Sequence, residues 1–197
     1  MEDNDTRAMR ALLNSVKSCN LCDNLPLGPR PILQASSNAR VLIAGQAPGR
    51  ITHEKGIAFD DPSGKRLRDW MGVTPTMFYD AEKIAILPMG FCFPGAGKSG
   101  DLPPRSECAS NWRKPLLARL PNVEFTIIIG RYAMDWHVRD TKKISLTEHA
   151  KSWREKLPSK LVLPHPSPRN NRWLKQNPWF EKDVLPCLKE RVHNLLY

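Results

Sequence analysis

Residues 41–49 are Val-Leu-Ile-Ala-Gly-Gln-Ala-Pro-Gly, four aliphatic residues followed at once by a polar loop rich in Gly and Pro. An uninterrupted apolar run of this length predicts a strand buried on both faces, as in a parallel sheet covered by helices. Residues 161–170, Leu-Val-Leu-Pro-His-Pro-Ser-Pro-Arg-Asn, repeat this arrangement. Because the carboxyl ends of parallel strands lie at one edge of a sheet, the two loops are predicted to meet where open α/β sheets bind ligands.

Strands and helices alternate along the rest of the chain. Further aliphatic strands are expected at 84–87 and 125–130, and helices at 6–18, 62–71, 106–120, 132–138 and 177–196, with interruptions near Pro115 and Pro186. Residues 93–104 are expected to form a long loop, and the polar segment 140–160 is assigned no element. This order predicts an α/β fold, a three-layer αβα sandwich around a four-stranded parallel sheet.

The 197 residues are enough to bury a hydrophobic core in a single domain spanning 1–197. No apolar run approaches the roughly 20 residues that span a bilayer, so no membrane partner is expected. The N-terminus is acidic and lacks the apolar core of a signal peptide. These features predict a cytoplasmic monomer.

The charge is positive and uneven. The chain carries 30 Lys and Arg against 20 Asp and Glu, a net charge of +10. Residues 151–175 contain seven Lys and Arg (Lys151, Arg154, Lys156, Lys160, Arg169, Arg172 and Lys175) but only one acidic residue, Glu155. A basic tract flanking the second loop favours phosphate attraction and DNA as the partner. The alternative is a solvated basic face without a ligand.

Four cysteines form a pattern suited to a metal. Cys19 and Cys22 make a Cys-x-x-Cys pair, and Cys92 and Cys108 would complete a four-thiolate set if the fold brings them to the N-terminal segment. In a reducing compartment such a set indicates zinc or an iron–sulfur cluster rather than disulfides. The alternative is a set of small buried cysteines, which is the interpretation adopted for Cys187.

The loops themselves carry the chemistry. The turn after Gly45 favours backbone N–H groups near Gln46 that point at a ligand oxygen. A neutral imidazole at His165 can donate a hydrogen bond to a carbonyl oxygen that gains negative charge. Ser167 can bind a phosphate or cap the loop, and residues 168–170 have the shape and charge of a wedge for a groove.

Together these motifs resemble those of the uracil-DNA glycosylase superfamily. Its paired active-site motifs are a first loop of the type Gly-Gln/Glu-x-Pro and a second of the type His-Pro-Ser, and both occur here in that order. The cysteines are similar to those of the iron–sulfur (family 4-like) members, with Cys92 and Cys108 sixteen positions apart. The segment His-Pro-Ser-Pro-Arg-Asn resembles the second motif of the single-strand-selective members. The resemblance extends from Cys19 to Asn170.

The resemblance implies a role for each matching residue. His165 would stabilise the departing base together with Gln46 and Ala47, whereas Phe59 would stack on the base after it is flipped out of the helix. Gly45, Gly49 and Pro88 would line the base pocket. Ser167, Pro168, Arg169 and Asn170 would contact DNA. Cys19, Cys22, Cys92 and Cys108 would hold a 4Fe–4S cluster, with zinc as the alternative.

Three positions depart from the best-known members. Ala47 replaces a water-activating Asp, as it does in the iron–sulfur relatives. Pro88 stands where relatives have the Asn that reads the pyrimidine edge. Gly49 replaces a bulky ring that excludes thymine, which implies a pocket open to other bases.

The resulting hypothesis is a monofunctional DNA glycosylase of base excision repair that hydrolyses the N-glycosidic bond of uracil or another deaminated or damaged base. The alternative is a non-catalytic, lesion-binding protein of the same fold. An iron–sulfur redox protein is a third interpretation, although no feature of the sequence indicates an electron-transfer partner.

Overall fold

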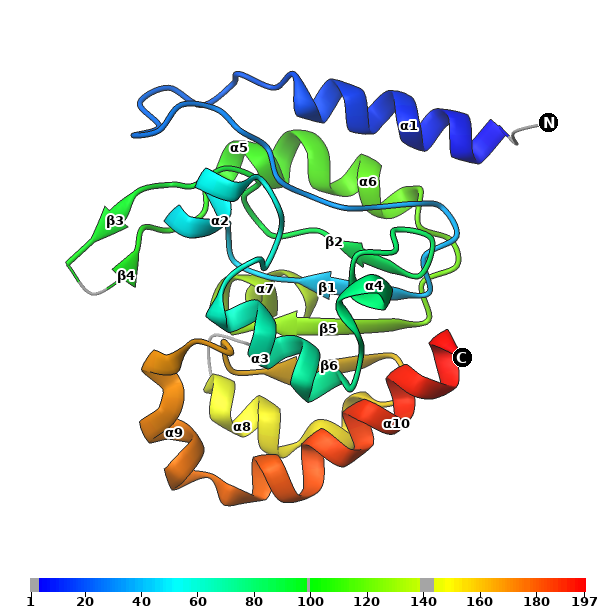
Figure 1. The fold of residues 1–197 in the computed structure, drawn as a ribbon, viewed down its shortest axis with the longest axis vertical. Helices are drawn as coiled ribbons and strands as arrows, with labels where there is room; N and C mark the ends of the chain where they lie inside the picture. Colours follow the sequence, from blue (N-terminus) through cyan, green and yellow to red (C-terminus); the bar gives the residue numbers. More distant parts are fainter. Residues whose placement is uncertain (1–3, 99, 139–143) are drawn as a thin grey trace.

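A four-stranded parallel sheet lies at the centre of the molecule (Figure 1). The computed structural model describes residues 4–98, 100–138 and 144–197. The strand order is β2 (Ile84–Ile86), β1 (Val41–Ala44), β5 (Phe125–Ile129) and β6 (Lys160–Leu163), and every neighbouring pair is parallel. All four strands lie where the aliphatic runs predicted them, and the α/β fold class is confirmed.

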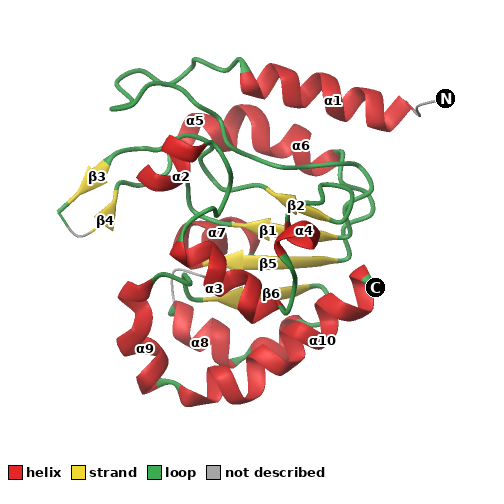
Figure 2. Ribbon diagram, viewed as in Figure 1, coloured by secondary structure: helices red, strands yellow, loops and turns green. Residues whose placement is uncertain are grey.

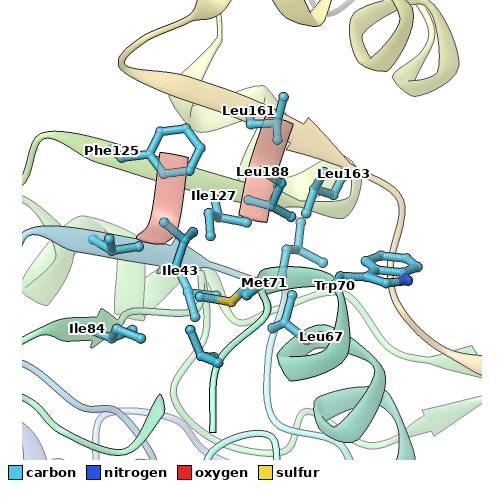
Figure 3. Close-up of a cluster of buried hydrophobic side chains, with 14 of the residues drawn as sticks. Ile43, Leu67, Trp70, Met71, Ile84, Phe125, Ile127, Leu161, Leu163 and Leu188 are labelled. Carbon is cyan, nitrogen blue, oxygen red and sulfur yellow. The ribbon is translucent and has the colours of Figure 1, made fainter. Parts of the chain in front are cut away.

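Alternation of side chains along the strands produces the three layers. Ile43, Ile127 and Leu161 face α3 (Pro62–Met71) and α10 (Leu185–Leu196) in the larger hydrophobic cluster, which Figure 3 shows in close-up. A buried aliphatic side chain of this size contributes about 1.5–3 kcal/mol to folding. This face therefore fixes α3, whose N-terminal end borders the site described below.

The opposite face of the sheet packs against a different set of helices (Figure 2). Leu42 and Leu87 belong to a hydrophobic cluster that includes residues of α1 (Asn4–Lys17) and α6 (Lys114–Ala118). Ala44, Ile128 and Val162 contact α7 (Gly130–His137). Both strand faces are covered, which explains why the strands are continuous apolar runs rather than alternating ones.

The predicted helix over 106–120 is divided into α5 (Ser106–Cys108), a π-helical turn (Ala109–Arg113) and α6. Proline has no N–H to donate to the preceding turn, so the hydrogen-bond pattern changes from α-helical to π-helical just before Pro115. The same pattern occurs near Pro186, where a π-helical turn (Phe180–Val184) leads into α10.

Several elements were not predicted from the sequence. They are α2 (Arg50–Lys55), α4 (Pro75–Phe78), α8 (Leu146–Lys151), α9 (Asn171–Gln176), the 3₁₀ turns Trp153–Lys156 and Pro168–Asn170, and a hairpin of β3 (Ala96–Gly97) and β4 (Gly100–Asp101) within the expected loop. Of the segment 140–160, residues 140–143 lie outside the described residues. Within the described part of the chain, the helices are all too short or too polar to cross a membrane.

Candidate active site

The loops that follow β1 and β6 border one cavity of about 590 Å³ at the carboxyl edge of the sheet. The first loop contributes residues 45–50, and the second contributes His165, Ser167, Arg169 and Asn170. Phe59 and Pro88 also line the cavity. The structure thus brings together every residue expected at the base pocket and three of the four expected to contact DNA. Pro168 is exposed and does not line the cavity.

Backbone hydrogen bonds fix the orientation of the first loop. The carbonyl oxygens of Gly45 and Gln46 accept the N–H groups of Met89 and Gly90, each at 2.9 Å. In a trans peptide the N–H points away from the preceding carbonyl, so the N–H groups of Gln46 and Ala47 are turned away from residues 89–90. Among the described residues, no hydrogen bond uses either N–H. Both remain available to a ligand.

Phe59 is held in a conformation that is unusual for a side chain of its size. Its φ of 55° lies in the left-handed region, where a non-glycine residue costs roughly 1–2 kcal/mol. The ring packs edge-on against Phe78, with 6.2 Å between centroids. Gly64 makes this possible, because a Cβ there would lie 1.6 Å from the carbonyl oxygen of Phe59. The ring is therefore positioned by the first turn of α3.

Hydrogen bonds also brace the second loop. The Ser167 hydroxyl accepts the N–H of Arg169 at 3.0 Å, so this serine caps the following 3₁₀ turn. Asn170 Nδ2 donates to the carbonyl of His165 at 2.7 Å, and Arg66 donates to the carbonyl of Ser167 at 3.2 Å. The capping alternative for Ser167 is thus present. No hydrogen bond among the described residues uses its hydroxyl hydrogen, which can therefore reach a phosphate.

His165 sits in an environment that favours the neutral imidazole. Burial lowers its pKa below the usual value near 6.5, and this effect outweighs the opposing influence of Asp61 and Asp101. Arg169 acts in the same direction as burial. At neutral pH the ring is therefore uncharged and can donate one hydrogen bond.

Two carboxylates line the cavity, and sequence reasoning identified neither of them as a site residue. Asp61 caps α3 and accepts the N–H of Gly64 at 2.7 Å. Asp101 lies on β4, and a Cβ on Gly49 would lie 3.4 Å from its Oδ2. No hydrogen bond or ion pair among the described residues engages the Asp101 carboxylate. The β3–β4 hairpin thus places a free carboxylate beside the first loop, where Ala47 supplies none.

The hairpin also connects the two loops. Gln46 Nε2 donates to the carbonyl of Leu102 at 3.3 Å. A Cβ on Gly100 would lie 2.8 Å from Nη1 of Arg169, so the guanidinium lies directly over this glycine. Within the expected loop 93–104, Gly97 and Gly100 permit a tight turn. The pairing of β3 with β4 could not be deduced from sequence periodicity.

The basic tract is only partly at the cavity. Arg169, Arg172 and Lys175 are exposed on or beside the second loop and α9. Lys160, in contrast, begins β6 at the opposite edge and donates to the carbonyl of His137 at 2.9 Å. The interpretation of residues 151–175 as one phosphate-binding tract is therefore too broad, because the strand separates its halves.

The four cysteines are brought to one place. Burial is the main cause that raises the thiol pKa values of Cys22, Cys92 and Cys108, the last to about 12. The four lie close enough together that Cys19 also raises the thiol pKa values of Cys22, Cys92 and Cys108, and Cys22 raises those of Cys92 and Cys108.

Two nitrogen donors approach the sulfurs. They are Trp112 Nε1, at 3.2 Å from Cys19 Sγ, and the N–H of Phe91, at 3.4 Å from Cys108 Sγ. Among the described residues, no group of three or more His, Cys, Asp or Glu side chains is arranged so that it could hold a metal ion. All five thiols are free of disulfides. The donor chemistry suits a thiolate-bound metal, and its identity stays a prediction.

These features define an α/β protein with a ligand cavity at the carboxyl edge of its sheet. The chain belongs to the Uracil DNA glycosylase superfamily, whose family model matches residues 33–189. The chain is similar to the solution NMR structure of a candidate uracil DNA glycosylase from Methanosarcina acetivorans. The match covers 82% of this chain and 98% of that protein. Its sequence identity is 15% and the TM-score is 0.46.

Proposed function

We propose that this protein is a monofunctional DNA glycosylase that hydrolyses the N-glycosidic bond of uracil or another deaminated or damaged base. The observation that carries the proposal is the cavity shared by the Gln46 and His165 loops, with Phe59 beside them. Membership of the superfamily supports glycosylase chemistry. The choice of base is the finer part of the proposal.

The cavity suits a base that has left the DNA stack. A flipped base would lie against the Phe59 ring, a contact worth roughly 1–3 kcal/mol for aromatic side chains that stack on bases. Pro88 offers no side-chain hydrogen bond, so recognition would depend on backbone groups and on the cavity's shape. Gly49 leaves room beside the base, which favours a substrate range wider than uracil alone.

Bond cleavage would leave negative charge on the base. As the bond between the sugar C1′ and the base nitrogen breaks, its electron pair stays on the base. His165 and the N–H groups of Gln46 and Ala47 are the donors available to a base carbonyl oxygen. Donors aimed at charge that develops in the transition state each contribute about 100-fold to 1000-fold in rate.

Water would complete the reaction at C1′ and lose a proton. Asp61 is engaged as a helix cap, whereas Asp101 has no partner among the described residues. Asp101 is therefore the carboxylate best suited to accept the proton from water. The base leaves as an anion and takes its proton from solvent, which balances the step.

Cys19, Cys22, Cys92 and Cys108 would hold a 4Fe–4S cluster, with zinc as the alternative. The cluster would join the N-terminal segment to the region around α5 and contribute stability without reacting. Visible absorption of the freshly purified protein distinguishes the two metals, because the zinc form is colourless. We expect Cys22→Ser to lose both metal and thermal stability, whereas Cys187→Ser keeps both.

Excision assays test the proposal directly. Single- and double-stranded oligonucleotides containing uracil, hypoxanthine or xanthine are incubated with the protein, and abasic sites are revealed by alkaline cleavage. We expect the protein to excise at least one of these bases, and we expect His165→Ala to lower the excision rate about 100-fold or more. His193→Ala, a change at an exposed histidine of α10, is the matched control and keeps full activity.

A lesion-binding protein without catalysis is the second candidate. It is favoured by the absence of a polar side chain at Ala47 and Pro88. Tight binding to the same oligonucleotides, with no abasic sites in either the wild type or His165→Ala, supports this candidate and contradicts the enzyme.

A further inference from the structure

Arg113 is fully buried in the π-helical turn between α5 and α6. Burial lowers its pKa to about 10, so the guanidinium remains charged at neutral pH. No ion pair among the described residues includes it, and its Nε has no hydrogen-bond partner. A buried charge without a carboxylate is costly and is uncommon unless it serves a purpose.

The polar contacts of Arg113 lead to the cavity wall. Nη1 donates to the carbonyls of Leu87 and Pro88, at 2.8 and 3.0 Å. Nη2 lies 2.5 Å from Nε2 of His137. Burial, with the charges of Arg113 and Lys160, lowers the pKa of His137 to about 3. This imidazole is therefore neutral and accepts from Arg113 without cancelling its charge.

Residues 87–90 connect this cation to the first loop. Pro88 lines the cavity, and its carbonyl accepts from Arg113 on the protein side. The next two N–H groups, of Met89 and Gly90, donate to the carbonyls of Gly45 and Gln46. These bonds turn the N–H groups of Gln46 and Ala47 away from the wall. Arg113 thus holds the segment that orients the unpaired donors.

We propose that Arg113 is a positioning residue of the glycosylase reaction, and that its fixed cation behind Pro88 favours the anionic leaving base. The inference rests on the proposed function, since it concerns charge that appears only as the glycosidic bond breaks. A preorganised charge in a region poor in water stabilises such an anion more than it stabilises the neutral substrate. The effect is therefore largest for the poorest leaving groups.

The dependence of the excision rate on the leaving base tests the role of the Arg113 charge. Arg113→Gln keeps a donor but loses the cation, Arg113→Lys keeps the cation, and Lys114→Gln removes an exposed charge one residue away. Single-turnover excision of uracil and 5-fluorouracil is compared in the same single-stranded oligonucleotide. We expect Arg113→Gln to lose about tenfold in the single-turnover rate constant on uracil, less than for a direct donor. The loss on 5-fluorouracil is smaller because its anion is more stable, and the protein concentration that gives half the maximal rate is unchanged.

Three variants act as controls for this comparison. Lys114→Gln is expected to match the wild type, and Arg113→Lys to retain the leaving-group dependence. His137→Gln perturbs the packing but leaves the cation in place, so it too is expected to keep the wild-type dependence. An equal loss on both bases in Arg113→Gln means a structural role only and overturns the inference.

A second measurement does not depend on catalysis. The pKa of free 5-fluorouracil bound in the cavity is followed by ¹⁹F NMR, and we expect it to be lower in the wild type than in Arg113→Gln. If the wild type cleaves no base but shows this difference, the proposed function fails and the charge effect stands. If the wild type cleaves the base and the pKa of the bound base is the same in the wild type and in Arg113→Gln, the inference about Arg113 fails while the proposed function stands.

Discussion

Gly64→Ala tests whether the first turn of α3 positions Phe59. The added Cβ would lie 1.6 Å from the carbonyl oxygen of Phe59 and 2.5 Å from its carbonyl carbon. Real Cβ contacts are essentially never shorter than 3.0 Å, so the two segments must separate by more than 1 Å. Because the contacted atoms are backbone, no side-chain rotation relieves the overlap. The carbonyl also accepts from Arg68 at 3.2 Å, and this bond would be strained as well.

The expected loss of stability follows from two opposing effects. Overpacking costs about 3 kcal/mol, and the better helix propensity of Ala over Gly returns about 1 kcal/mol. A net loss of about 2 kcal/mol lowers Tm by roughly 4–8 °C for a chain of this size. Since a displacement of about 1 Å at a reacting centre can cost 100-fold, we also expect excision to fall by about that factor.

Urea denaturation followed by circular dichroism measures the stability, and the oligonucleotide assay measures excision. Gly45→Ala is the matched control for stability, because its Cβ would lie 3.5 Å from the Phe59 ring, an ordinary contact. We expect that control to stay within about 0.5 kcal/mol of the wild type. A Gly64→Ala protein with the wild-type free energy of unfolding and excision rate would refute this account of Phe59.

Three further predictions concern charge. Asp101→Asn is expected to lower kcat about 100-fold without changing Tm, since the residue is exposed and acts on water; unchanged kcat removes it from the mechanism. Arg169→Ala is expected to reduce the slope of log Kd against log salt by about one for DNA; an unchanged slope places the phosphate contact elsewhere. Because the pKa of His137 is lowered to about 3, the unfolded chain binds more protons below pH 6.5. Stability is then lost as pH falls, by at most about 1.4 kcal/mol per pH unit, and His137→Gln flattens this dependence in urea titrations at pH 7 and 5; an equally steep dependence in the variant contradicts the assignment.

The strands and the two loops could be predicted because their signals are local. The run 41–44 is long enough and apolar enough to require burial on both faces, and the Gly/Pro loop after it marks the strand end. The β3–β4 hairpin could not be predicted, because two-residue strands carry no period and their pairing depends on loop closure. Asp101 was missed as a consequence.

Arg113 was missed for a different reason. A charged residue on a helix is usually solvated, so Arg113 was not assigned to the core, although it lies three and seven positions before the buried Leu116 and Leu120, on the same helix face. It is fully buried at the end of the π-helical turn that precedes Pro115. The proline is visible in the sequence, but the burial of Arg113 appears only in three dimensions.

The crystal structure of the protein with a single-stranded oligonucleotide containing 2′-fluoro-2′-deoxyuridine, whose glycosidic bond resists cleavage, tests the shared cavity directly. We predict that the uracil lies between the Gln46 and His165 loops, stacked on Phe59, with a carbonyl oxygen about 3 Å from the His165 ring. DNA bound on another face, or a base excluded from this cavity, would contradict the account.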